Sequence, residues 1–488
     1  MTYVFGFNHD EAIRSFERAA TADPSAAMPH WGIAWALGPN YNMDIDDPRS
    51  KQAFDEVQKA QTLAASGPEN ERIYIAAFAG RYSPDPKADR SALAQKYSQA
   101  MRDLTQRYPD DLDAATLYAE SLMNLRPWKL WTLDGKAEAG TAAIIQVLRA
   151  VLARDPNHIG ANHYYIHTLE ASPTPEQALD SAKRLESLVP DMGHLVHMPA
   201  HIYGRTGDHA LAARANRAGA EADLAYFKAG APRGTFYEMG YFTHNLHFLV
   251  DSEMMQGNFS GAQKAAQELS DALSPHLDMM PMAESMVASS TSLLMRFGKV
   301  EDILALPAPD VKRPVLTAWW HFARGVALAR QGRVPDALAE RQALVRSTAK
   351  VPEGALFGGT GLTPATNILR LATTVLDARI ADARGQTPQA VRLWQHAVVV
   401  GDQVPYDEPP IWFYPLRESL GAALLRAGDA AAAEQVFRDD LAKHPRNARA
   451  LFGLSESLER QQKSAADSRA AFTAAWTNAD VQLTIDGL

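Results

Sequence analysis

Apolar residues recur at helical spacing along almost the whole chain, in segments separated by glycine and proline. Side chains three and four positions apart lie on one face of a helix, so each segment predicts a helix with one buried face. No segment shows a convincing alternation of apolar and polar residues, which a half-buried β-strand would require. The pattern therefore predicts an all-α protein.

The helical segments also repeat at a fixed interval. Pro156 and Pro190 each close a predicted helix, in ARDPN and SLVPD, and they lie 34 residues apart. This interval is the period of the tetratricopeptide repeat (TPR), whose unit is a pair of antiparallel helices, A and B. The spacing of these prolines therefore resembles the TPR family. The family's pattern places small residues where the two helices touch, glycine at the end of helix A and proline after helix B.

Later stretches fit the same frame. Before Pro445, glycine, alanine and phenylalanine stand where the repeat favours small and aromatic residues, at Gly421, Gly428, Ala433 and Phe437. The stretch RGVALARQGRVPDAL matches in the same way. The resemblance covers nearly the whole chain, and it implies a TPR-like α-solenoid of about ten antiparallel helix pairs. It further implies a right-handed superhelix with a concave groove.

We expect a single solenoid over residues 1–488, with N-terminal repeats and insertions over 1–157, histidine-bearing central repeats over 158–275 and C-terminal repeats over 276–488. In this frame the chain opens halfway through an A helix. Either another element covers the following B helix, or the sequence is a shortened form of a longer protein. The opening stretch MTYVFGFNHDEAIRSF shows no signal peptide. The compartment stays open: cytoplasmic as written, periplasmic if a longer form carries a leader.

Seven of the 15 histidines fall on three consecutive predicted A helices, at positions that line the concave surface. Within each helix they are three or four residues apart, so they share a face. Proline, glycine and alanine define the repeat frame without reference to these histidines. The seven are His163 and His167 on the first helix, His194, His197 and His201 on the second, and His244 and His247 on the third.

A single helical histidine is usually a hydrogen-bonded structural residue, but seven on one surface would repel one another if they were protonated. A bound metal keeps such rings neutral and oriented. Packed helices lie about 8–10 Å apart, which lets two neighbouring A helices share one metal. We expect one centre formed by His163, His167, His197 and His201. A second centre is expected from His194, His244 and His247, and whether there is one centre or two stays open.

Three acidic residues on the same surface are candidate catalytic groups. Glu170 and Asp251 are placed to complete a ligand shell or to orient a ligand from outside it, and Glu120 lies on the preceding A helix. Imidazole suits copper, iron and zinc, whereas a shortage of carboxylates disfavours magnesium and calcium. In ligand set alone the site resembles the dicopper oxygen-binding proteins. A nearby acid would equally serve a zinc hydrolase, in which it acts as base towards a metal-bound water.

The amino-acid composition excludes several kinds of site and partner. The chain has no cysteine, which excludes disulfides, thiolate-bound zinc and iron–sulfur clusters. Its net charge is −9 and it has no run rich in lysine and arginine, which argues against a nucleic-acid partner. No apolar run approaches the roughly 18 residues of a membrane helix, so we expect no membrane partner.

The histidine stretches GANHYYIHTLEAS, GHLVHMPAHIYGRTGD and HNLHFL resemble those of an uncharacterised bacterial family of long TPR proteins. This resemblance implies the fold and the shared motifs, and it implies no reaction. Aromatic residues around the motifs, such as Tyr237 and Tyr241, are usually core residues at helical spacing. The insertion WKLW (Trp128 to Trp131) either covers the groove or anchors its own loop, and we favour the anchor.

Two classes of function follow. The first is a metal-dependent enzyme that acts on a small molecule in the concave groove, with oxidoreductase or oxygenase chemistry ahead of zinc-type hydrolysis. The second is a non-catalytic TPR scaffold that binds a peptide, a protein partner or metal. A carboxylate-clamping groove would carry asparagine, lysine and arginine where the central repeats carry histidine and acids, which argues against that form of scaffold. Homo-oligomer formation stays open.

Overall fold

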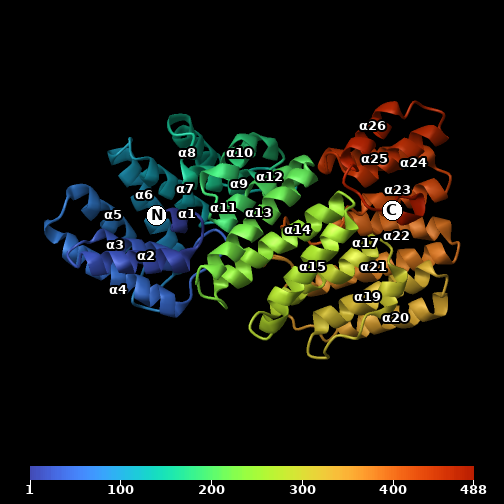
Figure 1. Ribbon diagram of the computed structural model, residues 1–488, viewed down its shortest axis with the longest axis horizontal. Helices are drawn as coiled ribbons and strands as arrows, with labels where there is room; N and C mark the ends of the chain where they lie inside the picture. Colours follow the sequence, from blue (N-terminus) through green and yellow to red (C-terminus); the bar gives the residue numbers. More distant parts are fainter. The chain divides into compact units, whose positions relative to one another are not determined.

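The computed structural model describes residues 1–488, and it is helical, with isolated β-bridges but no strand. The chain divides into two compact units (Figure 1): Met1–Ile202 with Ala218–Phe242, and Tyr203–Arg217 with Thr243–Leu488. The prediction of an all-α protein is confirmed. None of the helices combines the length and the hydropathy that crossing a membrane requires.

The helices of the first unit are short to medium in length. They are α1 (Thr2–Phe5), α2 (His9–Ala22), α3 (Met28–Leu37), α4 (Asp47–Leu63), α5 (Glu69–Ala79), α6 (Arg90–Arg107), α7 (Leu112–Met123), α8 (Thr141–Arg154), α9 (Ile159–Leu169), α10 (Leu179–Leu188) and α11 (Gly193–His197). The unit also holds the 3₁₀ turns η1 (Ala64–Ser66) and η2 (Pro175–Ala178) and the π-helical segment η3 (Tyr237–Phe242). Helices α12 (Pro199–Thr206) and α13 (His209–Lys228) have residues in both units.

Consecutive helices of this unit pack against each other as pairs: α3 with α4, α5 with α6, α7 with α8, and α9 with α10. Aspartates cap several of their N-termini. The carboxylates of Asp46, Asp89 and Asp111 accept backbone N–H groups in the first turns of α4, α6 and α7. Such a cap stabilises a helix by about 0.5–2 kcal/mol. The points at which these helices begin are therefore encoded locally.

The second unit consists of further helix pairs. Its helices are α14 (Thr243–Met255), α15 (Phe259–Leu273), α16 (Glu284–Val287), α17 (Ser289–Arg296), α18 (Val300–Ala305), α19 (Pro314–Arg330), α20 (Val334–Thr348), α21 (Ala365–Ala383), α22 (Thr387–Gly401), α23 (Arg417–Arg426), α24 (Ala430–Lys443), α25 (Ala448–Arg460) and α26 (Ala466–Ala475). Short 3₁₀ turns are η4 (Ser274–His276), η5 (Pro281–Ala283) and η6 (Ile485–Gly487). The pairs are α14 with α15, α17 with α18, α19 with α20, α21 with α22, α23 with α24, and α25 with α26.

Four pairs in the first unit and six in the second agree with the predicted number of helix pairs. Phe437 on α24 shows why the repeat needs small residues. A Cβ on Gly421 of α23 would lie 2.4 Å from its ring, and a Cβ on Gly453 of α25 would lie 2.1 Å from it. Only glycine admits the buried ring at both positions, so this ring packs tightly between two A helices.

The boundary between the two units runs through residues 158–275, which we expected to form one set of central repeats. The histidines from His163 to His201 belong to the first unit, whereas His244 and His247 belong to the second, together with Asp251. A single solenoid over the whole chain, and the sense of its superhelix, stay predictions.

Candidate metal centre

Helix α9 carries the first group of predicted ligands. His158 caps it, since its Nδ1 accepts the backbone N–H of Ala161 at 3.1 Å. Every residue from Gly160 to Leu169 is buried, so α9 is an interior helix that is apolar or hydrogen-bonded on all sides. His163 and His167 are one turn apart on it, and Glu170 follows at its C-terminal end.

The second group stands on two short helices. Helix α11 carries His194 and His197 and ends at His197, and α12 begins at Pro199 and carries His201. Proline lacks the N–H that would continue the first helix, which explains the break. His201 therefore stands on a different helix from His194 and His197.

The start of α11 is held by two residues from the end of the unit. A Cβ on Gly193 would lie 2.1 Å from Oδ1 of Asp223, so the position admits only glycine. The hydroxyl of Tyr237 donates to the same Asp223 oxygen at 2.8 Å, and it lies 3.4 Å from the backbone nitrogen of His194. This arrangement places the His194 ring over α9.

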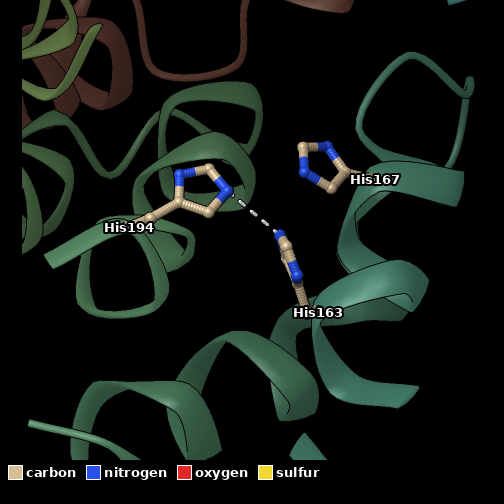
Figure 2. A group of neighbouring side chains, drawn as sticks. All are labelled: His163, His167 and His194. Carbon is tan, nitrogen blue, oxygen red and sulfur yellow. Dashed lines mark hydrogen bonds between the residues drawn. The ribbon is translucent and has the colours of Figure 1, made fainter. Parts of the chain in front are cut away.

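Three histidines from α9 and α11 form the first group of the cluster (Figure 2). Nε2 of His194 lies 3.2 Å from Nε2 of His163. One ring nitrogen from each of these residues and from His167 lies within 4.8 Å of the others. We had expected His194 to belong to a second centre, and the structure instead brings it to His163 and His167. The short α11 allows this, because its first turn faces α9.

His197 and His201 form the second group, with their Nε2 atoms 2.7 Å apart. Ring contacts join the two groups, with centroid distances of 5.6 Å between His167 and His201 and 5.7 Å between His194 and His197. None of these five rings is more than 1% exposed. The first unit therefore contains one continuous buried cluster of five histidines.

The Nδ1 atoms on the outer side of three rings face oxygen acceptors. Nδ1–H of His163 donates to the carbonyl oxygen of Phe5 at 2.5 Å. Glu170 serves two rings: Oε1 accepts Nδ1–H of His167 at 2.9 Å, and Oε2 lies 2.8 Å from Nδ1 of His201. A neutral ring that carries its proton on Nδ1 presents a lone pair at Nε2. These contacts therefore favour the form of the three rings in which Nε2 carries a lone pair, which can bind a metal ion.

Burial keeps two of the rings, those of His163 and His201, neutral. It lowers the pKa of His163 from 6.5 to about 3, an effect that repulsion from His201 strengthens and the Phe5 hydrogen bond opposes. Burial alone lowers the pKa of His201 to about 3. Neutral imidazoles are the form that binds a metal ion. At neutral pH protons do not compete for these two rings.

Aromatic side chains enclose the cluster, and the N-terminal segment supplies the central one. The Phe7 ring lies 4.6 Å from that of His163 and stacks on His167 at 5.8 Å and on His194 at 5.5 Å. Phe7 adopts a left-handed φ of 58°, which is uncommon for a bulky residue and turns the chain so that the ring points inward. Tyr241 covers His194 at 4.6 Å.

The WKLW insertion is anchored, as favoured from the sequence, and it also contacts the histidine cluster. Trp131 anchors the loop, because its indole N–H donates to the carbonyl of Thr168 at 2.7 Å. Trp128 lies edge-on to His167 at 6.0 Å and packs against Tyr41 at 4.8 Å. The insertion is thus fixed at one end and lines the cluster at the other.

Glu120, a predicted catalytic residue, lies in a different environment. Its carboxylate is 3.6 Å from the guanidinium of Arg81 and accepts the side-chain amide of Asn124 at 2.6 Å. Burial raises the pKa of Glu120, and Arg81 opposes that rise. Glu120 therefore belongs to a buried ion pair on α7, and its contacts include none of the five histidines.

His244, His247 and Asp251 lie on α14 of the second unit. His244 is 4.0 Å from a carboxylate oxygen of Glu408. His247 and Asp251 line a cavity of about 30 Å³ together with Ser285, Ser289 and Ser292. Burial lowers the pKa of His247 to about 4 and raises that of Asp251 to about 7. Their membership of a metal centre stays a prediction.

The distances within the five-histidine cluster fit metal ligation. Two nitrogens bound to one tetrahedral metal at about 2.0–2.1 Å lie about 3.3–3.4 Å apart, and ligands at a right angle lie about 2.8–3.0 Å apart. The His163–His194 separation of 3.2 Å falls between these values, and the His197–His201 separation of 2.7 Å is close to the second. An all-imidazole set with a carboxylate behind it suits copper, iron or zinc.

Residues 419–480 match the tetratricopeptide repeat family. They contain α24 and α25, where Phe437 packs against glycines. The match and the succession of helix pairs together establish a TPR-like all-α fold. No curated protein matches the chain. The resemblance to long bacterial TPR proteins with these histidine motifs stays a prediction.

Two solved structures are similar over most of the chain. Human IFIT1, in a dimer with m7Gppp-AAAA, is 10% identical, with a TM-score of 0.35 and coverage of 93% of this chain and 91% of its own. Yeast Tom70 is 9% identical, with a TM-score of 0.32 and coverage of 94% and 87%. At these scores neither likeness carries an argument about function.

Sequence reasoning missed several residues of the candidate centre. The carbonyl of Phe5 and the ring of Phe7 come from a segment more than 150 residues before α9, and no local pattern marks them. Asn40 and His9 contact the aromatic side chains that enclose the cluster. Nδ2 of Asn40 is 3.4 Å from both Nε2 of His9 and the hydroxyl of Tyr241. The histidine spacing, Glu170 and the neighbouring aromatic residues are the part of the centre that the sequence indicates.

Proposed function

We propose that the five buried histidines of the first unit hold one or two transition-metal ions and that the protein is a metal-dependent enzyme. Glu170 carries this proposal. Its two oxygens face Nδ1 of His167 and Nδ1 of His201, which turns both Nε2 atoms inward. A carboxylate that orients a histidine from behind recurs at protein metal centres.

The ligands of the primary ion would be His163, His167 and His194, whose ring nitrogens gather within 4.8 Å. His197 and His201 would complete this centre or hold a second ion beside it. Copper, iron or zinc would supply Lewis acidity, and copper or iron would also supply electron transfer. The protein would contribute neutral ligands, an oriented set of lone pairs and an aromatic enclosure that limits water.

The position of the acids favours oxidoreductase chemistry over hydrolysis in this unit. A zinc hydrolase needs a carboxylate that can accept a proton from metal-bound water. Both oxygens of Glu170 face imidazole nitrogens, and Glu120 is paired with Arg81. Neither acid is placed as that base, so hydrolysis at zinc is the alternative. A small-molecule substrate is part of the proposal.

A non-catalytic scaffold is the second candidate. The TPR match over residues 419–480 supports it, because repeat arrays present extended surfaces to partners. In that case the histidines would bind metal for structure or storage, or would be a hydrogen-bonded core. A peptide or protein partner, or a second copy of the chain, would then bind elsewhere on the repeats.

Metal content tests the proposal directly. The protein, purified without a histidine tag and loaded with copper, iron or zinc in turn, is dialysed and its metal content is measured by elemental analysis. We expect about one or two equivalents of one metal, because a preformed neutral site binds strongly. A visible absorption band would identify copper or iron. Less than about one-tenth of an equivalent of every metal would refute the metal centre.

Substitutions locate the bound metal. His163→Ala and His194→Ala should each remove most of it, whereas His396→Ala, on the exposed side of α22, should leave it unchanged. Circular dichroism checks that each variant is folded. Equal loss in the His396 variant would show that the metal is adventitious. Oxygen consumption by the metal-loaded protein then distinguishes an enzyme from a scaffold, because only the proposed oxidoreductase predicts it.

A further inference from the structure

The second unit contains a larger cavity that has no connection with the proposed function. Its volume is about 440 Å³, within the range of about 300–1,000 Å³ for small-molecule sites. Helices α17, α19, α21, α23 and α25 contribute to its wall, as does the tail segment Asp486–Leu488. Five arginines line it against three acids, an excess of positive charge in an acidic protein.

Two of the three acids are already paired with arginines of the same lining. Glu418 forms a bidentate ion pair with Arg296, and Asp382 binds Arg426 at 2.9 Å. The third acid, Asp486, contributes its backbone carbonyl to Arg330. Two of the five guanidinium groups are therefore neutralised by acids in the cavity wall.

The other three arginines make no hydrogen bond to a side-chain carboxylate. Arg330, Arg449 and Arg379 bind main-chain oxygens of residues 486, 487 and 488 at 2.8, 2.9 and 3.0 Å. None of the three takes part in an ion pair. Arg449 is 3% exposed, and its Nε–H has no acceptor. A buried N–H donor without an acceptor is costly, and in the wall of a cavity it is a donor that a ligand can satisfy.

The charges reinforce one another. Burial, and then repulsion from Arg296, lower the pKa of Arg449 to about 9. Burial and repulsion from Arg379 also lower the pKa of Arg330. Several cations held together in a poorly hydrated space make a field that attracts anions. The lining also contains apolar side chains, Phe322, Val326, Val375 and Phe413.

We propose that this cavity binds a small organic anion, with its phosphate or carboxylate groups on Arg330, Arg379 and Arg449 and its apolar body against Phe322 and Phe413. The guanidinium group forms paired, charge-assisted hydrogen bonds with both kinds of oxyanion. The cavity volume of about 440 Å³ and the apolar residues of the lining distinguish the site from a surface patch of basic residues. This site is independent of the histidine cluster, and neither proposal requires the other.

Calorimetric titration tests the site with two probes, inorganic pyrophosphate and citrate, at low ionic strength on the full-length protein. We expect one equivalent of at least one probe to bind, with an affinity that falls as salt is added. The stronger probe distinguishes a phosphate from a carboxylate ligand. Absence of binding by both probes, or binding that is insensitive to salt, overturns the proposal.

Two variants and a control complete the test. Arg330→Gln and Arg379→Gln should each weaken the stronger probe by at least about tenfold, since each removes a charged hydrogen-bond donor. Arg341→Gln is the control. Arg341 on α20 pairs with Asp377 on α21, and neither residue lines the cavity. Unchanged affinity in both cavity variants, each folded by circular dichroism, contradicts the assignment. An equal loss in the Arg341 variant contradicts it as well.

Discussion

Nδ1–H of His167 donates a hydrogen bond of 2.9 Å to Oε1 of Glu170, three residues later at the end of α9. Both residues are at most 1% exposed, so the contact is shielded from water and from salt. It determines which nitrogen of His167 carries the proton. The lone pair on Nε2 is thereby directed towards His163 and His194.

Replacement of Glu170 by glutamine should weaken metal binding by about 10–100-fold. The neutral amide holds the two imidazole rings less firmly than the carboxylate does, and it does not raise the basicity of their metal-binding nitrogens. Competition with a chelator measures the change. Glu176→Gln changes an exposed residue of η2. It is the matched control and should bind as the unmodified chain does. An unchanged affinity in the Glu170 variant would show that the carboxylate has only a structural role.

The metal-free protein should lose stability in acid. The pKa values of His163 and His201 are lowered from 6.5 to about 3 in the folded chain. Between these values the unfolded chain binds protons that the folded chain does not, so the free energy of unfolding rises with pH. We therefore expect it to fall as the pH is lowered from 6.5 towards 3. Urea titrations at several pH values in this window measure the slope.

A single substitution tests the source of that slope. His201→Gln removes one of the groups, and the slope should then correspond to about one proton fewer per molecule. His396→Gln removes an exposed histidine and should leave the slope unchanged. A slope that is the same in the His201 variant would mean that its ring is already protonated in the folded state.

Phe7 should protect the cluster from solvent. Phe7→Ala removes a buried ring that contacts His163, His167 and His194, and such changes cost about 3–5 kcal/mol of stability. We expect faster removal of bound metal by a chelator and a lower melting temperature. Phe236→Ala, which truncates a phenylalanine that is 41% exposed in the same unit, should change neither by a comparable amount.

The buried pair of Arg296 and Glu418 should be important for the second unit. Glu418→Gln leaves the guanidinium of Arg296 buried without its counter-charge, which typically costs about 3–5 kcal/mol. Asp377→Asn breaks the half-buried pair with Arg341 and should cost about 0–1 kcal/mol. Urea unfolding of both variants makes the comparison. Equal effects would show that the Arg296 charge is satisfied by other groups.

Much of this architecture could be predicted because its causes are local. The interval between Pro156 and Pro190, and the glycines around Phe437, report helix ends and close helix contacts that depend on residues near in sequence. The positions of His163 and His167 on one face of α9 follow from the helical period alone. The break at Pro199 follows from the missing N–H.

The composition of the candidate centre was less predictable. The sequence places His194 in a centre with His244 and His247 and gives no sign of its contact with His163, whose Nε2 lies 3.2 Å from its own. The repeat frame places Glu120 on the same surface as the histidines. In the structure it pairs with Arg81, which lies in the turn after α5. A repeat frame predicts on which face of its helix a residue lies. It does not predict which residue from another repeat contacts that face.

By itself the sequence determined the all-α class, the helix pairs and the faces on which the histidines lie, since these depend on backbone geometry and on neighbours a few residues apart. Only the tertiary structure decided which rings meet and what stands behind them. Phe5 offers a carbonyl oxygen and Phe7 a ring to His163 across more than 150 residues of chain. Such contacts arise when the chain packs, and a carbonyl group, present in every residue, leaves no mark in the sequence.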